Sequence, residues 1–179
     1  MIRSCLVALA LALAPLVPAQ GASYTLFGTA CGTPGFSPSL GVRGVPRLGT
    51  TFTVTYGGPN LCGFLGPISF RYRPILLTGV SRSAMGGIAL PWQVPPALAG
   101  GANCLLLQST DVVLPMPATP GGANCFASEA AFAVPNVPAL LGVEFYQQWL
   151  AWLERFDSRT STTTYTLLLS EGGHAKLGT

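Results

Sequence analysis

The sequence holds one histidine, His174, and therefore one imidazole that could act as a general base near neutral pH. A hydrolase built on it would need a nucleophilic serine, and an acid such as Asp111 or Asp157 within hydrogen-bond reach. No Gly-x-Ser-x-Gly elbow is present to expose such a serine. We therefore expect His174, which lies in the stretch Glu-Gly-Gly-His-Ala-Lys, to be a solvated turn residue.

The six carboxylates could do a different chemistry, because a glycosidase places two of them about 5–9 Å apart around one sugar. Glu144 and Asp157 are an example of such a pair. Only 8% of the residues are charged, however, so the carboxylates are more simply explained as surface groups that keep an apolar domain in solution. We expect a protein that is not an enzyme, with a hydrolase as the last alternative.

The cysteines and glycines do not form metal or cofactor motifs. Cys31, Cys62, Cys104 and Cys125 lie 31, 42 and 21 residues apart, so the Cys-x-x-Cys pairs of zinc and redox sites are absent. There is no Asp/Asn-rich calcium loop, and the paired glycines do not precede Lys-Ser/Thr as in a phosphate-binding loop. The sequence predicts no metal ion and no cofactor.

Large aromatic side chains are the candidates for ligand binding, namely Trp92, Tyr146, Trp149 and Trp152. If residues 143–153 form a strand, aromatic rings lie on both of its faces, and a sandwich buries only one face of each sheet. The outer rings could then bind sugar rings or a protein partner. Alternatively, loops cover the outer face or the strand is buried on both sides. Trp92 follows a proline in a loop and could equally cap the core.

Composition predicts a folded chain and excludes some partners. Hydrophobic residues make up 49% of the sequence, which argues against intrinsic disorder. The net charge of +3 and the single lysine are too little for a nucleic-acid-binding protein. The expected partner is a polysaccharide or a component of the cell envelope.

The start of the sequence resembles a signal for export. Arg3 precedes an apolar run from Leu6 to Val17, which is too short to span a bilayer, and Val17-Pro18-Ala19 suits cleavage before Gln20. We predict a signal peptide over residues 1–19 and one domain over residues 20–179. This domain would have no transmembrane segment and would be secreted, periplasmic or held at the cell surface. A less favoured interpretation is an N-terminal core helix.

An exported chain with four remaining cysteines is expected to form two disulfides. Spacing alone allows three connectivities.

The rest of the sequence alternates apolar and polar residues in short runs that are separated by Gly/Pro turns, which predicts strands over 51–56, 68–73, 104–108, 111–116, 125–134 and 162–169. The fold class is therefore all-β, an antiparallel β-sandwich of jelly-roll or immunoglobulin-like type.

The segment from Val143 to Phe156 fits two structures. As a strand it places Trp149, Ala151 and Leu153 on one face, and as a helix it stacks aromatic residues at spacings of three and four. We favour the strand.

Several segments together carry a resemblance that covers nearly all of residues 23–178: Ser23–Gly32, Pro46–Thr55, Cys104–Asp111, Val137–Gly142, Phe145–Trp149 and Lys176–Gly178. With them the chain resembles a group of small exported β-sandwich domains that are abundant in planctomycete-type bacteria, alone or at the C-terminus of larger secreted proteins. The resemblance implies a Cys31–Cys104 disulfide and leaves Cys62 for Cys125, with sequential pairing as the rival. It supplies no catalytic or binding residues, and the charged stretch 154–159 departs from the group.

The function expected from the sequence is structural or adhesive, at the cell envelope or outside the cell. The alternative is a carbohydrate-binding module that uses exposed tryptophan and tyrosine rings.

Overall fold

The structure is a computed structural model, and it describes residues 21–32, 37–58, 67–100, 103–117 and 127–179. The predicted signal peptide lies outside these residues. Cys62 and Cys125 also lie outside them, so the second predicted disulfide is not among the features described.

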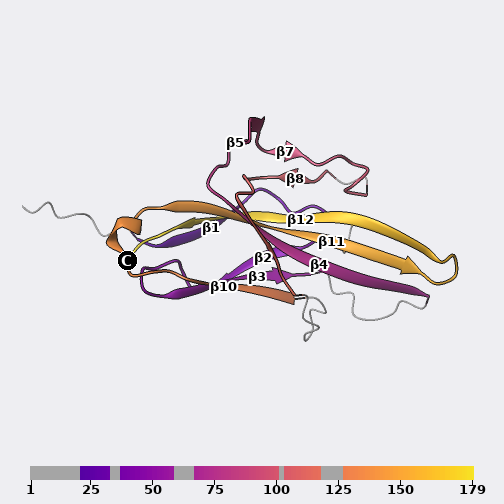
Figure 1. The fold of residues 1–179 in the computed structure, drawn as a ribbon, viewed down its shortest axis with the longest axis horizontal. Coiled ribbons are helices and arrows are strands. Elements are labelled where there is room, and N and C mark those ends of the chain that lie inside the picture. The colour runs from indigo at the N-terminus through magenta and orange to yellow at the C-terminus, as the bar shows by residue number, and fades with distance from the viewer. Residues whose placement is uncertain (1–20, 33–36, 59–66, 101–102, 118–126) are drawn as a thin grey trace, which may run out of the picture.

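The described residues form an all-β fold of two antiparallel sheets (Figure 1). The larger sheet has the strand order β1-β12-β11-β4-β9, and the smaller sheet has the order β10-β3-β2. Their bounds are β1 Ser23–Phe27, β2 Ser39–Arg43, β3 Thr51–Gly57, β4 Ile68–Gly79, β9 Val112–Pro115, β10 Ala127–Ala133, β11 Glu144–Asp157 and β12 Thr162–Lys176. The predicted antiparallel sandwich is thus confirmed.

Alternating side chains from both sheets fill the space between them. On β3, Phe52, Val54 and Tyr56 are buried while the threonines between them are more accessible, as the sequence alternation predicts. They pack against Trp149 and Leu76 of the larger sheet. This core holds the two sheets together by burying apolar area.

Edge strand β1 packs closely on β12 because two glycines leave room for its rings. A Cβ atom added to Gly172 would lie 2.4 Å from the Phe27 ring, and one added to Gly173 would lie 2.1 Å from the Tyr24 hydroxyl. Real Cβ atoms do not come so close, so any side chain in place of Gly172 or Gly173 would push these rings out of their present positions.

A long excursion between β4 and β9 lies on the outer face of the larger sheet, the face turned away from the smaller sheet. We call the described part of residues 80–110 the covering segment. It contains two short hairpins, made by β5 Ala84–Met85 with β6 Ile88–Ala89 and by β7 Trp92–Gln93 with β8 Leu105–Leu106. Figure 1 shows this segment above the larger sheet and the smaller sheet below it, which gives three layers.

The covering segment is joined to the sheet by a second apolar cluster and a disulfide. Leu77, Leu167 and Leu169 of the sheet pack against Val94 and Leu106 of the segment. Cys31 and Cys104 form a disulfide, which is the pair that the resemblance implied. The outer face is therefore partly covered, one of the alternatives that the sequence left open.

The predicted strands are present with shifted ends. The segment 143–156 is a strand, β11, and not a helix. The runs 68–73 and 162–169 are the beginnings of the longer strands β4 and β12, whereas 104–108 shortens to the two residues of β8. In the part of the chain that the structure describes, no helix is long and apolar enough to cross a membrane.

Candidate functional site

Among the described residues, His174 makes no hydrogen bond to Asp111 or Asp157, and it lies in strand β12 and not in the predicted turn. His174 Nε2 lies 3.1 Å from Glu144 Oε2, and Lys176 lies on the other oxygen of this carboxylate at 3.7 Å. Glu144 and Asp157 stand at opposite ends of β11, thirteen residues or about 40 Å apart, so they cannot flank one sugar. The example of a glycosidase pair is therefore wrong.

The Asp111 carboxylate bonds to Ser109 and Val80, and not to His174. Its Oδ2 accepts hydrogen bonds from the Ser109 hydroxyl at 2.7 Å and from the Val80 backbone N–H at 2.9 Å. These bonds, and above all the one from Ser109, lower the pKa of the Asp111 carboxyl.

Burial raises the pKa of the Tyr24 and Tyr56 hydroxyls well above the ordinary value, so neither is an acid or base near neutral pH.

Metal ligands are also dispersed. Among the described residues, no group of three or more His, Cys, Asp or Glu side chains could hold a metal ion.

The four aromatic residues predicted to bind a ligand lie in four different surroundings. Trp149 is fully buried between the sheets, with its Nε1 donating to the Thr55 carbonyl at 3.0 Å. Its prediction as a ligand-binding residue is therefore wrong, because alternation along β11 turns it toward the core.

Tyr146 belongs to a packed surface cluster at the β1 end of the outer face. Its ring stacks on His174 with 4.8 Å between ring centroids, and meets the Phe27 ring edge-on. The Arg82 guanidinium lies 4.2 Å above the Phe27 ring. These contacts already occupy the flat faces that a ligand would use, so the cluster is explained by packing.

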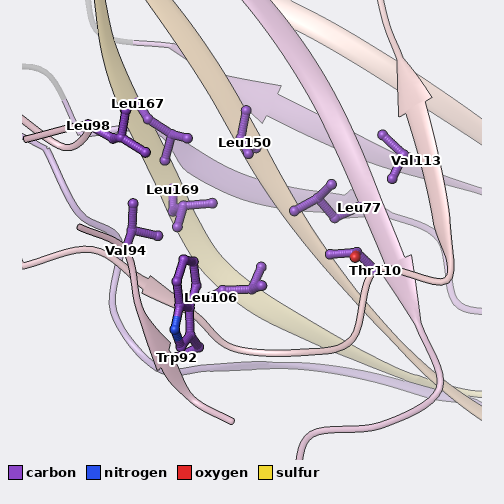
Figure 2. A pocket seen from close by; sticks show the side chains of 10 residues that line it. All are labelled: Leu77, Trp92, Val94, Leu98, Leu106, Thr110, Val113, Leu150, Leu167 and Leu169. Carbon is purple, nitrogen blue, oxygen red and sulfur yellow. The ribbon is translucent and has the colours of Figure 1, made fainter. Parts of the chain in front are cut away.

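Trp92 stands at the rim of an apolar hollow between the covering segment and the larger sheet. The hollow has a volume of about 210 Å³. Figure 2 shows the side chains that line it, which come from both layers: Leu77, Trp92, Val94, Leu98, Leu106, Thr110, Val113, Leu150, Leu167 and Leu169. Apart from the Trp92 ring nitrogen, the Thr110 hydroxyl is the one polar side-chain group among these residues. The Thr110 hydroxyl is engaged with the Met85 sulfur at 3.2 Å. The hollow thus suits an apolar group.

Trp152 lies at the edge of the covering segment, where it is half-buried against the second apolar cluster, and it begins a projection that we call the arm. The arm consists of residues 68–73 of β4, 152–157 of β11 and 162–167 of β12, and Figure 1 shows these strands running past the smaller sheet. Three rows of opposed residues cross its outer face: Arg73, Trp152 and Leu167, then Arg71, Glu154 and Tyr165, then Ser69, Phe156 and Thr163.

Aromatic rings and arginines are exposed together on this face. The Trp152 and Tyr165 rings lie 6.3 Å apart between centroids, with 26° between their planes. Tyr165 is 53% exposed and Phe156 38% exposed, although both are large apolar residues. From Trp152 to Phe156 the face extends about 13 Å along β11. Exposed apolar patches of this kind usually mark an interaction site.

Sequence reasoning found Trp152 but missed Tyr165, Phe156, Arg71 and Arg73 as its neighbours. The alternation in the sequence already placed Arg71 and Arg73 on one face of their strand and Tyr165 on one face of its own. What it did not contain was the register between the three strands, which brings these faces together.

Comparison with family models, with curated proteins and with solved structures finds no match to this chain. The resemblance to the planctomycete-type domains therefore stays a prediction.

Proposed function

We propose that this protein is an exported, non-catalytic β-sandwich with an adhesive role at the cell envelope or outside the cell, and that it binds polysaccharide through the outer face of the arm. The observation that carries the proposal is the pair of exposed rings of Tyr165 and Phe156, with the half-buried Trp152 ring stacked beside Tyr165 at the edge of the covering segment. Flat aromatic rings present an apolar surface, to which the apolar face of a sugar ring is complementary.

Export is supported by the apolar run over residues 6–17 and by the Cys31–Cys104 disulfide, because disulfides persist in oxidising compartments. A non-catalytic role is supported by the partners of these groups among the described residues: His174 contacts Glu144 and not Asp111 or Asp157, and Glu144 and Asp157 lie at opposite ends of β11.

Retention on insoluble and immobilised polysaccharides tests the proposal. Wild-type protein and Tyr165→Ala are compared with Trp92→Ala, a matched loss of an exposed ring from the covering segment. We expect Tyr165→Ala to weaken retention about tenfold, as for a residue near the centre of an interface, and Trp92→Ala to leave it unchanged. Equal retention of all three proteins would contradict the proposal.

The apolar hollow favours a second candidate function, the binding of a small apolar group. Its 210 Å³ exceeds an engineered cavity of about 150 Å³ that holds benzene, and is smaller than most drug-sized sites. Titration with an apolar naphthalene dye tests this candidate with the same two variants. Trp92→Ala should now weaken binding while Tyr165→Ala leaves it unchanged, and the reverse result would exclude the hollow.

A further inference from the structure

We propose that the polysaccharide is acidic, and that Arg71 and Arg73 bind its carboxylate groups while the aromatic rings bind its sugar rings. This inference rests on the proposed function, since it names the class of ligand for the same face.

The two arginines stand on one face of β4, two residues and about 6.6 Å apart. The side chain of Arg73 is 72% exposed. Its ion pair with Glu154 is loose, at 3.8 Å, and the structure gives Arg71 no ion-pair partner among the described residues. Guanidinium groups are therefore available on this face for an external anion.

Charge on the face is unbalanced in favour of an anion. In the three rows described above, Glu154 is the one acidic residue against the two arginines, so the face carries a net charge of +1. The Glu154 side chain is only 18% exposed, whereas that of Arg73 is 72% exposed. An acidic ligand would meet the guanidinium groups before it met this carboxylate.

The arginines and the rings are arranged side by side. Arg73 is directly opposite Trp152, and Arg71 shares its row with Tyr165 across Glu154. Directly opposed side chains on neighbouring strands start about 5 Å apart. A sugar ring that stacks on the β11 and β12 aromatics would thus hold a carboxylate substituent within reach of β4.

Guanidinium chemistry selects the kind of anion. The planar fork of arginine binds a planar carboxylate through two parallel hydrogen bonds. A nucleic-acid strand carries a phosphate about every 3.4 Å and is bound by many clustered cations, of which this face has two. A neutral polysaccharide would leave the arginines without a role.

The test compares uronic-acid polymers (polygalacturonate, alginate and hyaluronate) with their methyl esters, which keep the backbone and remove the charge. Dextran sulfate and an oligo-dT strand are included as other polyanions. The proteins are wild type, Arg71→Gln/Arg73→Gln, Tyr165→Ala, and Arg43→Gln, an exposed arginine of the smaller sheet that serves as a matched control. Thermal unfolding of each variant checks that it is folded.

We expect wild type to bind at least one uronic-acid polymer at least tenfold more tightly than its methyl ester, because hydrogen bonds to charged groups are stronger than those to neutral groups. The double arginine variant should lose this preference, and Arg43→Gln should keep it. Raising the salt from about 0.01 M to about 1 M should also remove it, since the Debye length falls from about 30 Å to about 3 Å.

Equal binding of acid and ester forms, weakened by Tyr165→Ala but not by the double arginine variant, would overturn this inference and leave the proposed function standing. Binding of no polysaccharide would overturn both. Tighter binding of dextran sulfate or oligo-dT than of every uronic-acid polymer would also overturn the inference.

Discussion

Two adjacent buried glutamines on β11 should lose very different amounts of stability on the same substitution. Gln148 is fully buried, and its side-chain amide bonds three backbone groups, two in the covering segment and one in β12. Its Oε1 accepts from the Leu107 N–H at 3.1 Å, and its Nε2 donates to the carbonyls of Leu105 and Ser170 at 3.0 and 2.8 Å. It thereby fixes the covering segment to the larger sheet at the point where the register of β11 and β12 shifts.

Replacing Gln148 with leucine leaves these backbone groups without partners. Leu107 N–H and the Ser170 carbonyl are bonded in fully buried surroundings, whereas the Leu105 carbonyl is in a part-buried one that water can reach. A buried polar group without a partner costs about 1–3 kcal/mol. Gln148→Leu should therefore lower the free energy of unfolding by about 2–6 kcal/mol, a large share of the 5–15 kcal/mol typical of a domain.

Gln147 is the matched control, because it is equally buried but faces the other way. Its Oε1 accepts from the Tyr24 hydroxyl at 3.1 Å, and its Nε2 has no partner among the described residues. Gln147→Leu removes one hydrogen bond and one unpaired donor together. The free energy of unfolding should therefore change by no more than about 1 kcal/mol.

Urea unfolding followed by circular dichroism measures both variants. Hydrogen exchange at the Leu107 amide provides a local readout, and exchange there should accelerate in Gln148→Leu alone. Equal stabilities for the two variants would refute the reasoning that Gln148 joins the layers.

Three further predictions concern stability. Removing the disulfide by Cys31→Ser/Cys104→Ser should cost about 4 kcal/mol in urea unfolding, because the bond closes a sequence separation of 73 residues; a loss under about 1 kcal/mol would contradict this. Trp149→Ala should cost about 3–5 kcal/mol by leaving a cavity, yet its remaining folded fraction should bind polysaccharide as wild type does. Asp111 has a lowered pKa when folded, so its carboxylate stabilises the fold at higher pH, and this contribution is lost as the pH falls through the folded value. The stability difference between wild type and Asp111→Asn should therefore shrink below about pH 3.9, and a constant difference from neutral to acid pH would count against the assignment.

Local alternation was enough to predict the strands and the all-β sandwich. The period of two in residues 51–56 reports burial on one side, which is a property of that strand by itself, whereas residues 143–156 have large apolar residues on both faces. The sequence also singled out Trp92 and Trp152, since large rings are conspicuous in any position.

What the sequence could not contain was how separate strands meet. The arm's outer face needs the register of β4 and β12 on β11, which depends on long-range pairing and on the irregularity beside Gln148. Trp149 was mistaken for a ligand-binding residue because the outer and inner faces of one strand look alike until its neighbours are known.

The most direct test of the account is to map where an oligogalacturonate contacts the folded protein by NMR chemical-shift changes during a titration. We expect the changes to concentrate on residues 69–73, 152–156 and 163–165. Changes confined to the covering segment around Trp92, or spread evenly over the smaller sheet, would contradict the claim that the arm is the binding surface.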